Sequence, residues 1–344
     1  MKKPLIVLTG PTAVGKTKLS ISLAKAVGGE IISADSMQVY KYMDIGSAKI
    51  MPEEMQGVPH YLVDALMPDE EFHIVRFQQM AKEAMEKIYA NGHIPILVGG
   101  TGFYIQAVTR DIDFTQAEQD DGYRASLEAL AQEKGVAYLH QMLAKVDPKS
   151  AEEIHENNVK RVIRALEFYH QNGSPISAHN EEQQERVSPY NLAYFVLNAP
   201  RELLYQRIDK RVDEMLAGGL VKEVEALKSM GYHRGMVSMQ GLGYKEILAY
   251  LDREMPLEEA VRILKRDTRH FAKRQLTWFR RELETLWINK DEFGYDDGKM
   301  LEYMLSICRE KGMLSELSFP GREFTRYIHR RSSQHSTELT ANCD

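Results

Sequence analysis

The stretch GPTAVGKT, residues 10–17, carries the residue types that bind phosphate groups. It matches the pattern G-x-x-x-x-G-K-[ST] and lies between an apolar run and a helical pattern. In such a loop the backbone N–H groups and the helix N-terminus bind phosphate oxygens, Lys16 adds a charge, and the Thr17 hydroxyl can bind Mg²⁺. The predicted phosphate site comprises Gly10, Pro11, Thr12, Ala13, Val14, Gly15, Lys16 and Thr17. The motif alone leaves open whether the phosphate is a fuel, a transferred group or a leaving group.

Two more stretches put polar residues at the ends of predicted strands. ISADSMQVY places Asp35 and Ser36 at the carboxyl edge where open α/β sheets bind ligands, although the same residues would also suit a helix N-cap. A phosphate-loop NTPase normally carries a Mg²⁺-binding aspartate on an apolar strand. The predicted strand in ILVGGTGFY ends in residues 99–101 instead, although the predicted strand in HYLVDAL offers Asp64. The glycines at this strand end could let a substrate approach the backbone, where Thr101 would hydrogen-bond it. Alternatively, they simply form a tight turn between the strand and the next helix. Group transfer is therefore favoured over fuel hydrolysis.

The segment VKRVIRALE brings Lys160, Arg161 and Arg164 within one helical turn of each other. These cations could close over phosphates, as the lid of a kinase does, or they could bind nucleic acid. A solvated helix face would show the same pattern. The residues alone leave the three interpretations open.

A second basic segment runs from residue 261 to 281, where eight Arg or Lys side chains accompany one acid, Asp267. Helical spacing predicts a buried stripe made of Val261, Leu264, Phe271, Leu276, Phe279 and Leu283. The cations expected to face outward are Arg262, Lys265, Arg266, Arg269 and Lys273. So many like charges repel one another unless a polyanion neutralises them, and His270 and Trp278 could stack on bases. The segment therefore favours nucleic acid as a partner.

The composition is that of a globular protein. The chain has 344 residues, enough for about two domains, and 43% of them are hydrophobic. The net charge of −6 argues against a surface that is basic throughout. Cys308 and Cys343 lie in no metal-binding or CxxC spacing, so neither a disulfide framework nor a zinc site is supported. We expect no signal peptide, no membrane contact and a cytoplasmic location.

The order of predicted elements is that of an α/β protein. Strand patterns at LIVLTG, EIISAD, IPILVGG, LAYFVLNAP and LWINKD alternate with helical ones, which predicts a P-loop NTPase-like parallel sheet covered by helices. Residues 114–190 carry helical patterns alone, which indicates a helical insertion domain. The expected division is a first core part at 1–113, the insertion at 114–190, a second core part with the basic helix at 191–314, and a polar, mobile tail at 315–344.

Several motifs together resemble the tRNA dimethylallyltransferase family, also called tRNA isopentenyltransferases. They are GPTAVGKT, SADSMQVY, MDIGSAK, LVGGTGFYI, RVIRALE, GLGYKE and AKRQLTWFR. The resemblance implies an enzyme that transfers a dimethylallyl group from dimethylallyl diphosphate to the N6 amine of the adenosine 3′ of the anticodon in tRNA, with Mg²⁺ as cofactor. The phosphate at the loop would then be a leaving group.

The resemblance also implies roles for individual residues. The implied catalytic residues are Lys16, Asp35, Thr101 and Arg211, with Asp35 as the general base. Residues 10–17 would hold the diphosphate, and Thr17 would bind the metal. The implied tRNA contacts are Asp35, Ser36, Met37, Gln38, Thr101, Arg124, Lys160, Arg161, Val162, Ile163, Arg164, Gln240 and Lys245. The expected partners are the anticodon stem-loop and dimethylallyl diphosphate, and we expect a monomer.

Two other classes of protein share part of this pattern. A small-molecule or nucleoside kinase would also have the phosphate loop, an acid after the second strand and a helical lid, and it would bind ATP tightly. A regulator that uses nucleotide only as a switch would bind RNA without turnover. Three residues also depart from the family pattern, since Tyr42, Ser47 and Lys160 stand where Gly, Thr and Gln are usual.

Overall fold

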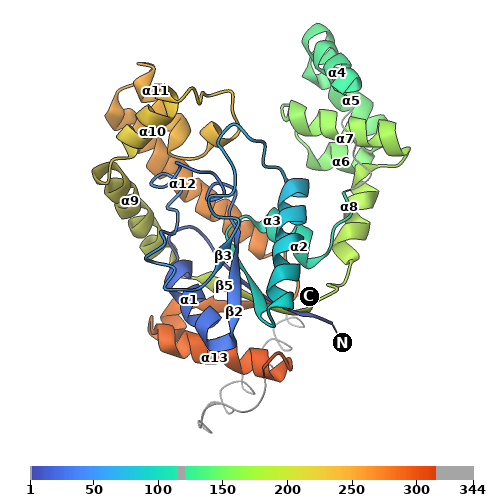
Figure 1. The fold of residues 1–344 in the computed structure, drawn as a ribbon. Coiled ribbons are helices and arrows are strands. Elements are labelled where there is room, and N and C mark those ends of the chain that lie inside the picture. Colours follow the sequence, from blue (N-terminus) through green and yellow to red (C-terminus); the bar gives the residue numbers. More distant parts are fainter. Residues whose placement is uncertain (1, 115–120, 315–344) are drawn as a thin grey trace, which may run out of the picture.

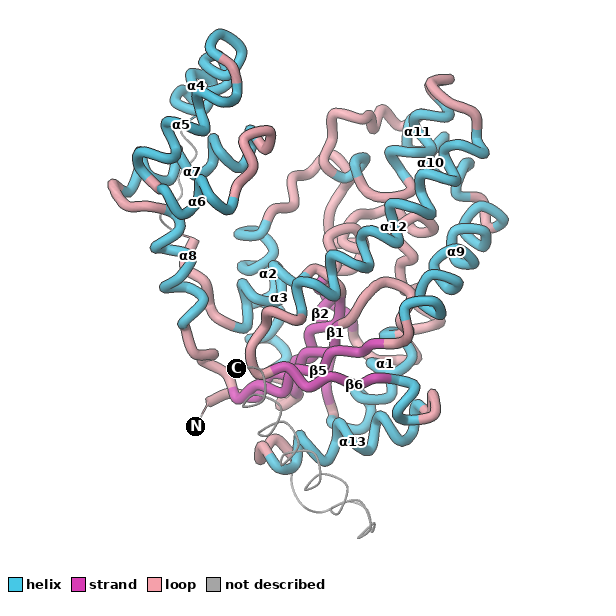
Figure 2. The backbone as a smooth tube through the Cα atoms, turned by 180° about the vertical axis from the view of Figure 1, so that it is seen from behind, coloured by secondary structure: helices cyan, strands magenta, loops and turns pink. Residues whose placement is uncertain are grey.

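The centre of the molecule is a six-stranded parallel sheet with the strand order β3-β2-β4-β1-β5-β6 (Figures 1 and 2). The computed structural model describes residues 2–114 and 121–314. The strands are β1 Pro4–Thr9, β2 Gly29–Ala34, β3 His60–Tyr61, β4 Ile94–Gly99, β5 Asn191–Asn198 and β6 Thr285–Asn289. Since all strands run the same way, their carboxyl ends share one edge, and the loop after β1 lies between the loops after β4 and β5. The α/β fold expected from the sequence is confirmed.

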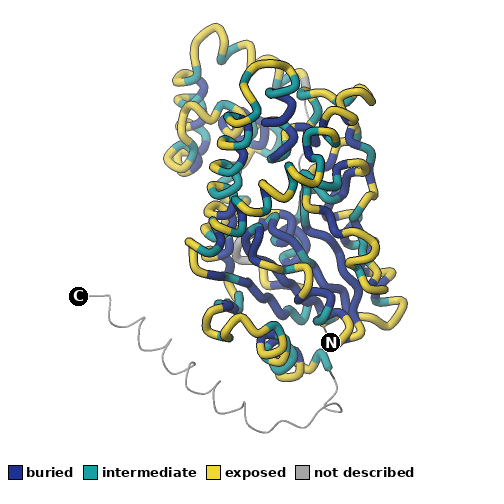
Figure 3. The backbone as a smooth tube through the Cα atoms, turned by 90° about the vertical axis from the view of Figure 1, so that its left-hand side faces the viewer, coloured by how far each residue is buried: buried dark blue, intermediate teal, exposed yellow. Residues whose placement is uncertain are grey.

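Helices cover both faces of the sheet, because neighbouring side chains of each strand point to opposite sides. Leu5 and Val7 of β1 pack into a cluster with α2, α3, α10, α11 and α12, whereas Ile6 and Leu8 pack with α1 and α13. The helices of the core are α1 Lys16–Val27, α2 Ile74–Ala90, α3 Gly102–Thr109, α9 Arg201–Ala217, α10 Leu220–Ser229, α11 Tyr244–Leu251, α12 Leu257–Phe279 and α13 Asp297–Glu310, with short 3-10 helices η1 Ser238–Gln240 and η2 Lys290–Phe293. Figure 3 shows buried backbone concentrated in the strands.

Five further helices form a separate bundle at one side of the core (Figure 1). They are α4 Asp121–Lys134, α5 Val136–Val146, α6 Pro148–Glu153, α7 Val159–Asn172 and α8 Ile176–Glu185. The bundle has its own apolar cluster, which includes Leu127, Leu139, Leu143 and Leu166. A core of its own lets the bundle extend from the sheet without sharing side chains with the main clusters.

One helix prediction needs correction, and the predicted tail falls outside the described residues. Residues 201–231 form two helices, α9 and α10, which are separated at Gly218 and Gly219. Leu283 was expected in the buried stripe of the basic helix, but α12 ends at Phe279 and Leu283 is 69% exposed. The tail at 315–344 lies outside the described residues. None of the described helices combines the length and the apolar character needed to cross a lipid bilayer.

Candidate active site

The phosphate loop joins β1 to α1 in a backbone conformation that glycine permits. Gly15 has φ 92° and immediately precedes Lys16, the first residue of α1. Lys16 Nζ donates hydrogen bonds to the carbonyl oxygens of Gly10 and Pro11, both at 2.9 Å. The amine is therefore held at the mouth of the loop. Burial lowers the pKa of Lys16 to about 8; the nearby Asp35 carboxylate opposes this shift and the Arg211 guanidinium adds to it.

A second lysine lies behind the loop and was missed in the sequence. Lys290, at the carboxyl end of β6, is buried, and its Nζ donates to the carbonyl oxygen of Val14 at 3.4 Å. The same nitrogen lies 3.2 Å from the position that a Cβ on Gly15 would take. Burial also lowers the pKa of Lys290. The signal available in the sequence was a lysine directly after an apolar strand, in LWINKD.

Asp35 follows β2 and caps a turn. Its Oδ1 accepts hydrogen bonds from the backbone N–H groups of Met37 at 2.8 Å and Gln38 at 3.3 Å. The chain then continues without a helix until α2, so the helix N-cap interpretation was wrong. Within the described residues the second carboxylate oxygen of Asp35 accepts no hydrogen bond. That oxygen is available as a hydrogen-bond acceptor.

The glycine turn after β4 is shaped by protein packing. A Cβ on Gly99 would lie 2.2 Å from the carbonyl oxygen of Ala34, and one on Gly100 would lie 2.2 Å from Gln275 Nε2. The tight-turn interpretation therefore explains these two glycines. Thr101 remains available, since its N–H donates to the Ala34 carbonyl at 3.2 Å while its hydroxyl makes no hydrogen bond in the described part of the chain.

Gln275 of α12 ties this turn to the phosphate loop. Its Nε2 donates to the carbonyl oxygen of Gly100 at 3.0 Å, and its Oε1 accepts from the N–H of Thr12 at 2.9 Å. A buried amide whose two ends are both satisfied fixes the two loops relative to each other. The signal for this residue in the sequence was weak: a polar side chain at a buried position of an amphipathic helix.

Arg211 completes the group around Lys16. It lies on α9, half-buried, and burial lowers its pKa while Glu214 opposes the shift. The structure therefore places Asp35 and Arg211 each within electrostatic reach of Lys16, and the N–H of Thr101 donates to the carbonyl oxygen of Ala34, the residue before Asp35. Of the four residues implied as catalytic, Asp35 and Thr101 follow β2 and β4, whereas Lys16 and Arg211 lie on α1 and α9.

The loop that follows Asp35 is anchored by two charged side chains that sequence reasoning missed. Glu223 of α10 accepts hydrogen bonds from three consecutive backbone N–H groups, those of Asp44 at 3.0 Å, Ile45 at 2.7 Å and Gly46 at 3.0 Å. Its carboxylate also accepts from the Tyr244 hydroxyl at 2.8 Å. One carboxylate thus satisfies four donors and holds residues 44–46 against α10 and α11.

Lys49 anchors the other end of the same loop. Its side chain is 1% exposed, and its Nζ contacts the Tyr40 carbonyl, Asp44 Oδ1 and Asp64 Oδ1 at 2.6, 2.6 and 2.5 Å. Asp64, the alternative Mg²⁺ ligand considered from the sequence, therefore already has a partner. It also follows β3, the edge strand, which is separated from β1 by β2 and β4.

The residues implied to contact tRNA fall into exposed and buried groups. Lys160 and Arg161 of α7 are exposed and form no ion pair among the described residues, and Arg164 is half-buried. Val162 and Ile163 are 1% and 3% exposed in the core of the bundle, because a helix with one packed face cannot present all five positions to a ligand.

Other implied tRNA contacts already have partners inside the protein. Arg124 forms a two-pronged ion pair with Glu167, both contacts at 2.7 Å. Lys245 lies 3.4 Å from Glu246, and the Gln240 side chain donates to the carbonyl oxygen of Arg234. Ser36, Met37 and Gln38 are half-buried at the turn beside Asp35.

The charges of α12 divide it into two halves. The four cations between residues 262 and 269 each pair with a carboxylate: Arg262 with Glu259, Lys265 with Asp213, Arg266 with Asp267 and Arg269 with Asp209. The expectation that a polyanion must neutralise this face was therefore wrong for these four. Two of the neutralising acids come from α9, which a local window of sequence cannot show.

The residues present fit a Mg²⁺ ion only in part. Thr17 is exposed at the start of α1, and its hydroxyl makes no hydrogen bond within the described residues. Those residues contain no group of three or more His, Cys, Asp or Glu that could hold a metal. A Mg²⁺ ion beside Thr17 would therefore take most of its oxygen ligands from diphosphate and water, as Mg²⁺ does in many phosphate sites.

Comparisons with known proteins agree with this geometry. The model of the IPP transferase family matches residues 38–282. The tRNA dimethylallyltransferases of Lachnoclostridium phytofermentans and Acetivibrio thermocellus are 62% and 53% identical over 312 and 304 residues, which cover 91% and 88% of this chain and 99% and 97% of theirs.

Solved structures give the same result. The full-length tRNA isopentenylpyrophosphate transferase of Bacillus halodurans aligns with a TM-score of 0.69 at 44% identity, covering 90% of this chain and 98% of that one. A eukaryotic dimethylallyltransferase acting on tRNA aligns with a TM-score of 0.75 at 28% identity, covering 95% and 84%. The kinase alternative receives no support from these comparisons. The chain belongs to the IPP transferase family.

Proposed function

We propose that this protein transfers the dimethylallyl group of dimethylallyl diphosphate to the N6 amine of the adenosine 3′ of the anticodon in tRNA. One observation carries the proposal: in a chain of this family, Asp35 and Arg211 lie within electrostatic reach of Lys16 at the phosphate loop, and Thr101 is bonded to the residue before Asp35. The relatives named above are enzymes of this type by name, and one of them is described as acting on tRNA.

The first requirement of the reaction is to make the allylic carbon electrophilic, because an aromatic amine is a weak nucleophile. The bond between this carbon and the diphosphate oxygen breaks, and the electron pair leaves with the diphosphate. Lys16, the loop N–H groups and Arg211 would stabilise the growing negative charge. A Mg²⁺ ion beside Thr17 would supply further charge compensation on the diphosphate oxygens.

The second requirement is to remove a proton from N6. As the bond between N6 and the allylic carbon forms, the amine becomes acidic, so an ordinary carboxylate suffices as the base. The free carboxylate oxygen of Asp35 would accept this proton, while the other oxygen stays in the turn with Met37 and Gln38. The Thr101 hydroxyl beside it would orient the amine.

The third requirement is that the target base leaves its stack. An anticodon loop makes this extrusion cheap, because its bases are not held in a duplex. The exposed Lys160 and Arg161 would contact the RNA backbone from the helical bundle. All the groups in this scheme come from one chain, which supports a monomer as the active species. A tRNA substrate supports a cytoplasmic location for the enzyme.

A direct assay tests the proposal. The intact protein is incubated with tRNA, Mg²⁺ and labelled dimethylallyl diphosphate, with labelled ATP as the alternative donor. We expect label in the tRNA only from the allylic donor, and loss of the label when the target adenosine is replaced by guanosine. Phosphate transfer from ATP would instead support the kinase, and RNA binding without transfer from either donor would support the regulator.

A further inference from the structure

Lys290 is a buried cation with few partners, and the proposed chemistry gives it no role. It begins η2 directly after β6, and its side chain is 9% exposed. Within the described residues its Nζ has two oxygen partners, the Val14 carbonyl at 3.4 Å and Asp297 Oδ1 at 3.7 Å. Asp297 also pairs with Lys18 at 3.0 Å, so one carboxylate serves two lysines. Such long contacts compensate poorly for taking an ammonium group out of water.

The surroundings of the Lys290 amine are mostly positive. Burial lowers its pKa, Asp297 of α13 opposes this shift, and Arg207 of α9 and Lys18 of α1 add to it. The first turn of α1, in front of the amine, contains no acid, and the N-terminus of a helix is itself positive. The positive charge behind the phosphate loop is therefore incompletely balanced, and an anion bound in the loop would balance it.

The contact with Val14 also fixes the direction of one peptide group. In a trans peptide the carbonyl and the following N–H point in opposite directions. Because the Val14 carbonyl points at Lys290, the N–H of Gly15 points away from it, toward the side of the loop that binds phosphate. Gly15 has φ 92° and no side chain, so its backbone resists a turn of this peptide only weakly. Lys290 supplies the restraint that Gly15 lacks.

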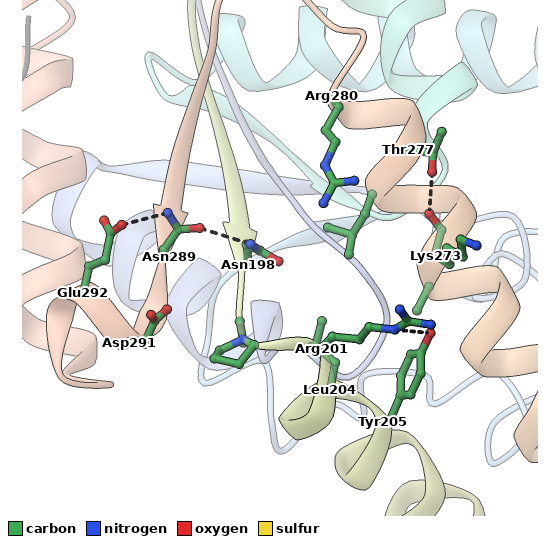
Figure 4. A pocket seen from close by; sticks show the side chains of 14 residues that line it. Asn198, Arg201, Leu204, Tyr205, Lys273, Thr277, Arg280, Asn289, Asp291 and Glu292 are labelled. Atoms are coloured by element: carbon green, nitrogen blue, oxygen red, sulfur yellow. Dashed lines mark hydrogen bonds between the residues drawn. The ribbon is translucent and has the colours of Figure 1, made fainter. Parts of the chain in front are cut away.

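The chain around Lys290 is held firmly enough to place its amine. Asn198 donates to Asn289 Oδ1 at 3.1 Å, and Asn289 donates to Glu292 Oε1 at 3.0 Å (Figure 4). Asn289 and Asp291, the two neighbours of Lys290, line the open cavity at the carboxyl ends of β5 and β6. Lys290 itself reaches the back of the phosphate loop. The hydrogen bonds of its neighbours thus fix the strand end from which the amine extends.

We propose that Lys290 is a positioning residue of the diphosphate site. Through the Val14 carbonyl it keeps the Gly15 N–H directed at the diphosphate, and its charge, held out of water, adds to the attraction of the anion. The loop then binds its ligand with two lysines, Lys16 at its mouth and Lys290 behind it. The inference rests on the proposed function, because it takes the ligand of the loop to be a diphosphate.

The test measures binding of inorganic diphosphate with Mg²⁺ by calorimetry. Lys290→Met keeps the length of the side chain but removes its charge and its donors. It should weaken binding by about 3- to 30-fold, the effect of one partly screened charge near the anion. Lys18→Met is the matched control, since it removes a cation that shares Asp297 but is 80% exposed. Solvent screens that charge, so the control should change the affinity less than about twofold.

The melting temperature separates this role from a purely structural one. Without ligand, Lys290→Met should unfold at the same temperature as the intact protein or at a higher one, because an apolar side chain replaces a poorly paired buried charge. A residue that only stabilises the fold would behave in the opposite way. A lower melting temperature of Lys290→Met would therefore overturn the inference, as would equal weakening of binding in Lys18→Met and Lys290→Met.

The pH dependence tests the charge directly. Lys16→Met is compared with the double variant Lys16→Met with Lys290→Met, so that neither protein has the amine of Lys16 and the titration of the ligand is common to both. The first should bind diphosphate several-fold more tightly at pH 7. This ratio should shrink toward one as the pH rises to about 10, because Lys290 has a lowered pKa and loses its charge. A ratio that stays constant over this range would overturn the inference.

Failure of the inference and failure of the proposed function give different results. If Lys290→Met binds diphosphate as tightly as the intact protein does, the inference is overturned and the proposed function stands. If the intact protein binds diphosphate but transfers no dimethylallyl group to tRNA, the proposed function fails, while the comparison of Lys290→Met with Lys18→Met still decides the role of Lys290. Absence of diphosphate binding by the intact protein would overturn both.

Discussion

The sheet edge and the helical bundle hold the residues of the proposed site in opposite ways. At the sheet edge, polar groups are bonded to the protein itself: Gln275 bridges Thr12 and Gly100, and Lys16 donates to two carbonyls of its own loop. On α7 of the bundle, Lys160 and Arg161 project into solvent without an ion-pair partner in the described residues. The groups proposed to act on the diphosphate and the amine are restrained, whereas the cations proposed to attract RNA keep their charge available.

Helix α12 contains both arrangements in one element. Its part up to residue 269 is tied to α9 by the ion pairs of Lys265 and Arg269, in which the carboxylates of α9 neutralise the two cations. Its last turns leave Lys273 and Arg274 unpaired among the described residues, and Arg281, just after the end of the helix, is unpaired too; Trp278 lies among these cations. A count of cations along a sequence therefore does not measure the field that a ligand meets, because distant acids decide which cations remain free.

The largest expected effect tests the restrained side of this comparison. Asp35→Asn keeps an oxygen that accepts from Met37 and Gln38, but it removes the group that takes the proton. We expect turnover to fall at least about a hundredfold, since loss of a general base typically removes 10² to 10⁴ in rate. RNA affinity and melting temperature should stay near those of the intact protein. Single-turnover assays together with thermal unfolding measure both.

The opposite outcome would break the comparison at its strongest point. Turnover retained in Asp35→Asn, at an unchanged melting temperature, would mean that Asp35 only stabilises its turn. Asp35→Ala would separate the two roles further, because it removes both the proton acceptor and the acceptor for the turn.

The next effect concerns the loop anchored by Glu223. Glu223→Ala leaves three backbone N–H groups and the Tyr244 hydroxyl without their acceptor, so residues 44–46 should shift. Small displacements of positioning groups can cost about 10²-fold in rate, and we expect a loss of about 10- to 100-fold in kcat/KM for tRNA. The KM for dimethylallyl diphosphate should change little, because Gln275 holds the phosphate loop independently.

The matched control is Glu225→Ala, which removes an exposed carboxylate from the same helix. It should leave both parameters unchanged. An equal rise in both KM values for Glu223→Ala would show that the two loops are not held independently, and the division between restrained regions would need revision.

Local motifs predicted the parts of this site that depend on neighbouring residues. The phosphate loop, the strand ends that carry Asp35 and Thr101, and the cations of α7 could all be found because each lies within one continuous stretch of sequence. Parallel strands then bring such strand ends to a common edge, which is a property of the fold class.

The partners that restrain the site could not be found in this way. Thr12 and Gln275 are 263 residues apart, and Ile45 and Glu223 are 178 apart. Pairing at such distances depends on how helices cross the sheet, and no local period encodes it. For the same reason the acids of α9 that neutralise Lys265 and Arg269 were not anticipated, and Leu283 was assigned to a helix that ends four residues earlier.

A smaller effect follows from the lowered pKa of Lys16, about 8. Diphosphate attracts the charged amine, so the complex favours the protonated form of Lys16. Above pH 8 the amine of the free protein is mostly neutral, so binding must then take up a proton. The affinity for inorganic diphosphate should therefore fall by up to about tenfold per pH unit above pH 8. Lys16→Met has no amine to titrate, so comparing both proteins by calorimetry from pH 6.5 to about 9.5 removes the titration of the ligand itself.

Parallel pH profiles for the two proteins would mean that Lys16 does not carry the charge that diphosphate meets. The restrained region would then owe its anion affinity to the loop N–H groups, to Arg211 and to Lys290, which burial also leaves with a lowered pKa. A double variant, Lys16→Met with Lys290→Met, would show whether the second lysine had taken over this role.

The smallest expected effect tests the exposed side of the comparison. Lys160→Ala and Arg161→Ala should each weaken binding of the anticodon stem-loop only a few-fold at moderate salt, and each should reduce the salt slope by about 0.7 to 0.9. The reason is that an exposed cation contributes by releasing counterions from a phosphate, which any nearby cation partly replaces. Lys299→Ala on α13 is the control, because that lysine is exposed on a helix that packs against α1 at the sheet face away from α12. If Lys160→Ala gave the same slope as Lys299→Ala and the intact protein, the α7 cations would be ordinary solvated charge, and any RNA contact would have to come from the sheet edge and the other basic segment, residues 261–281.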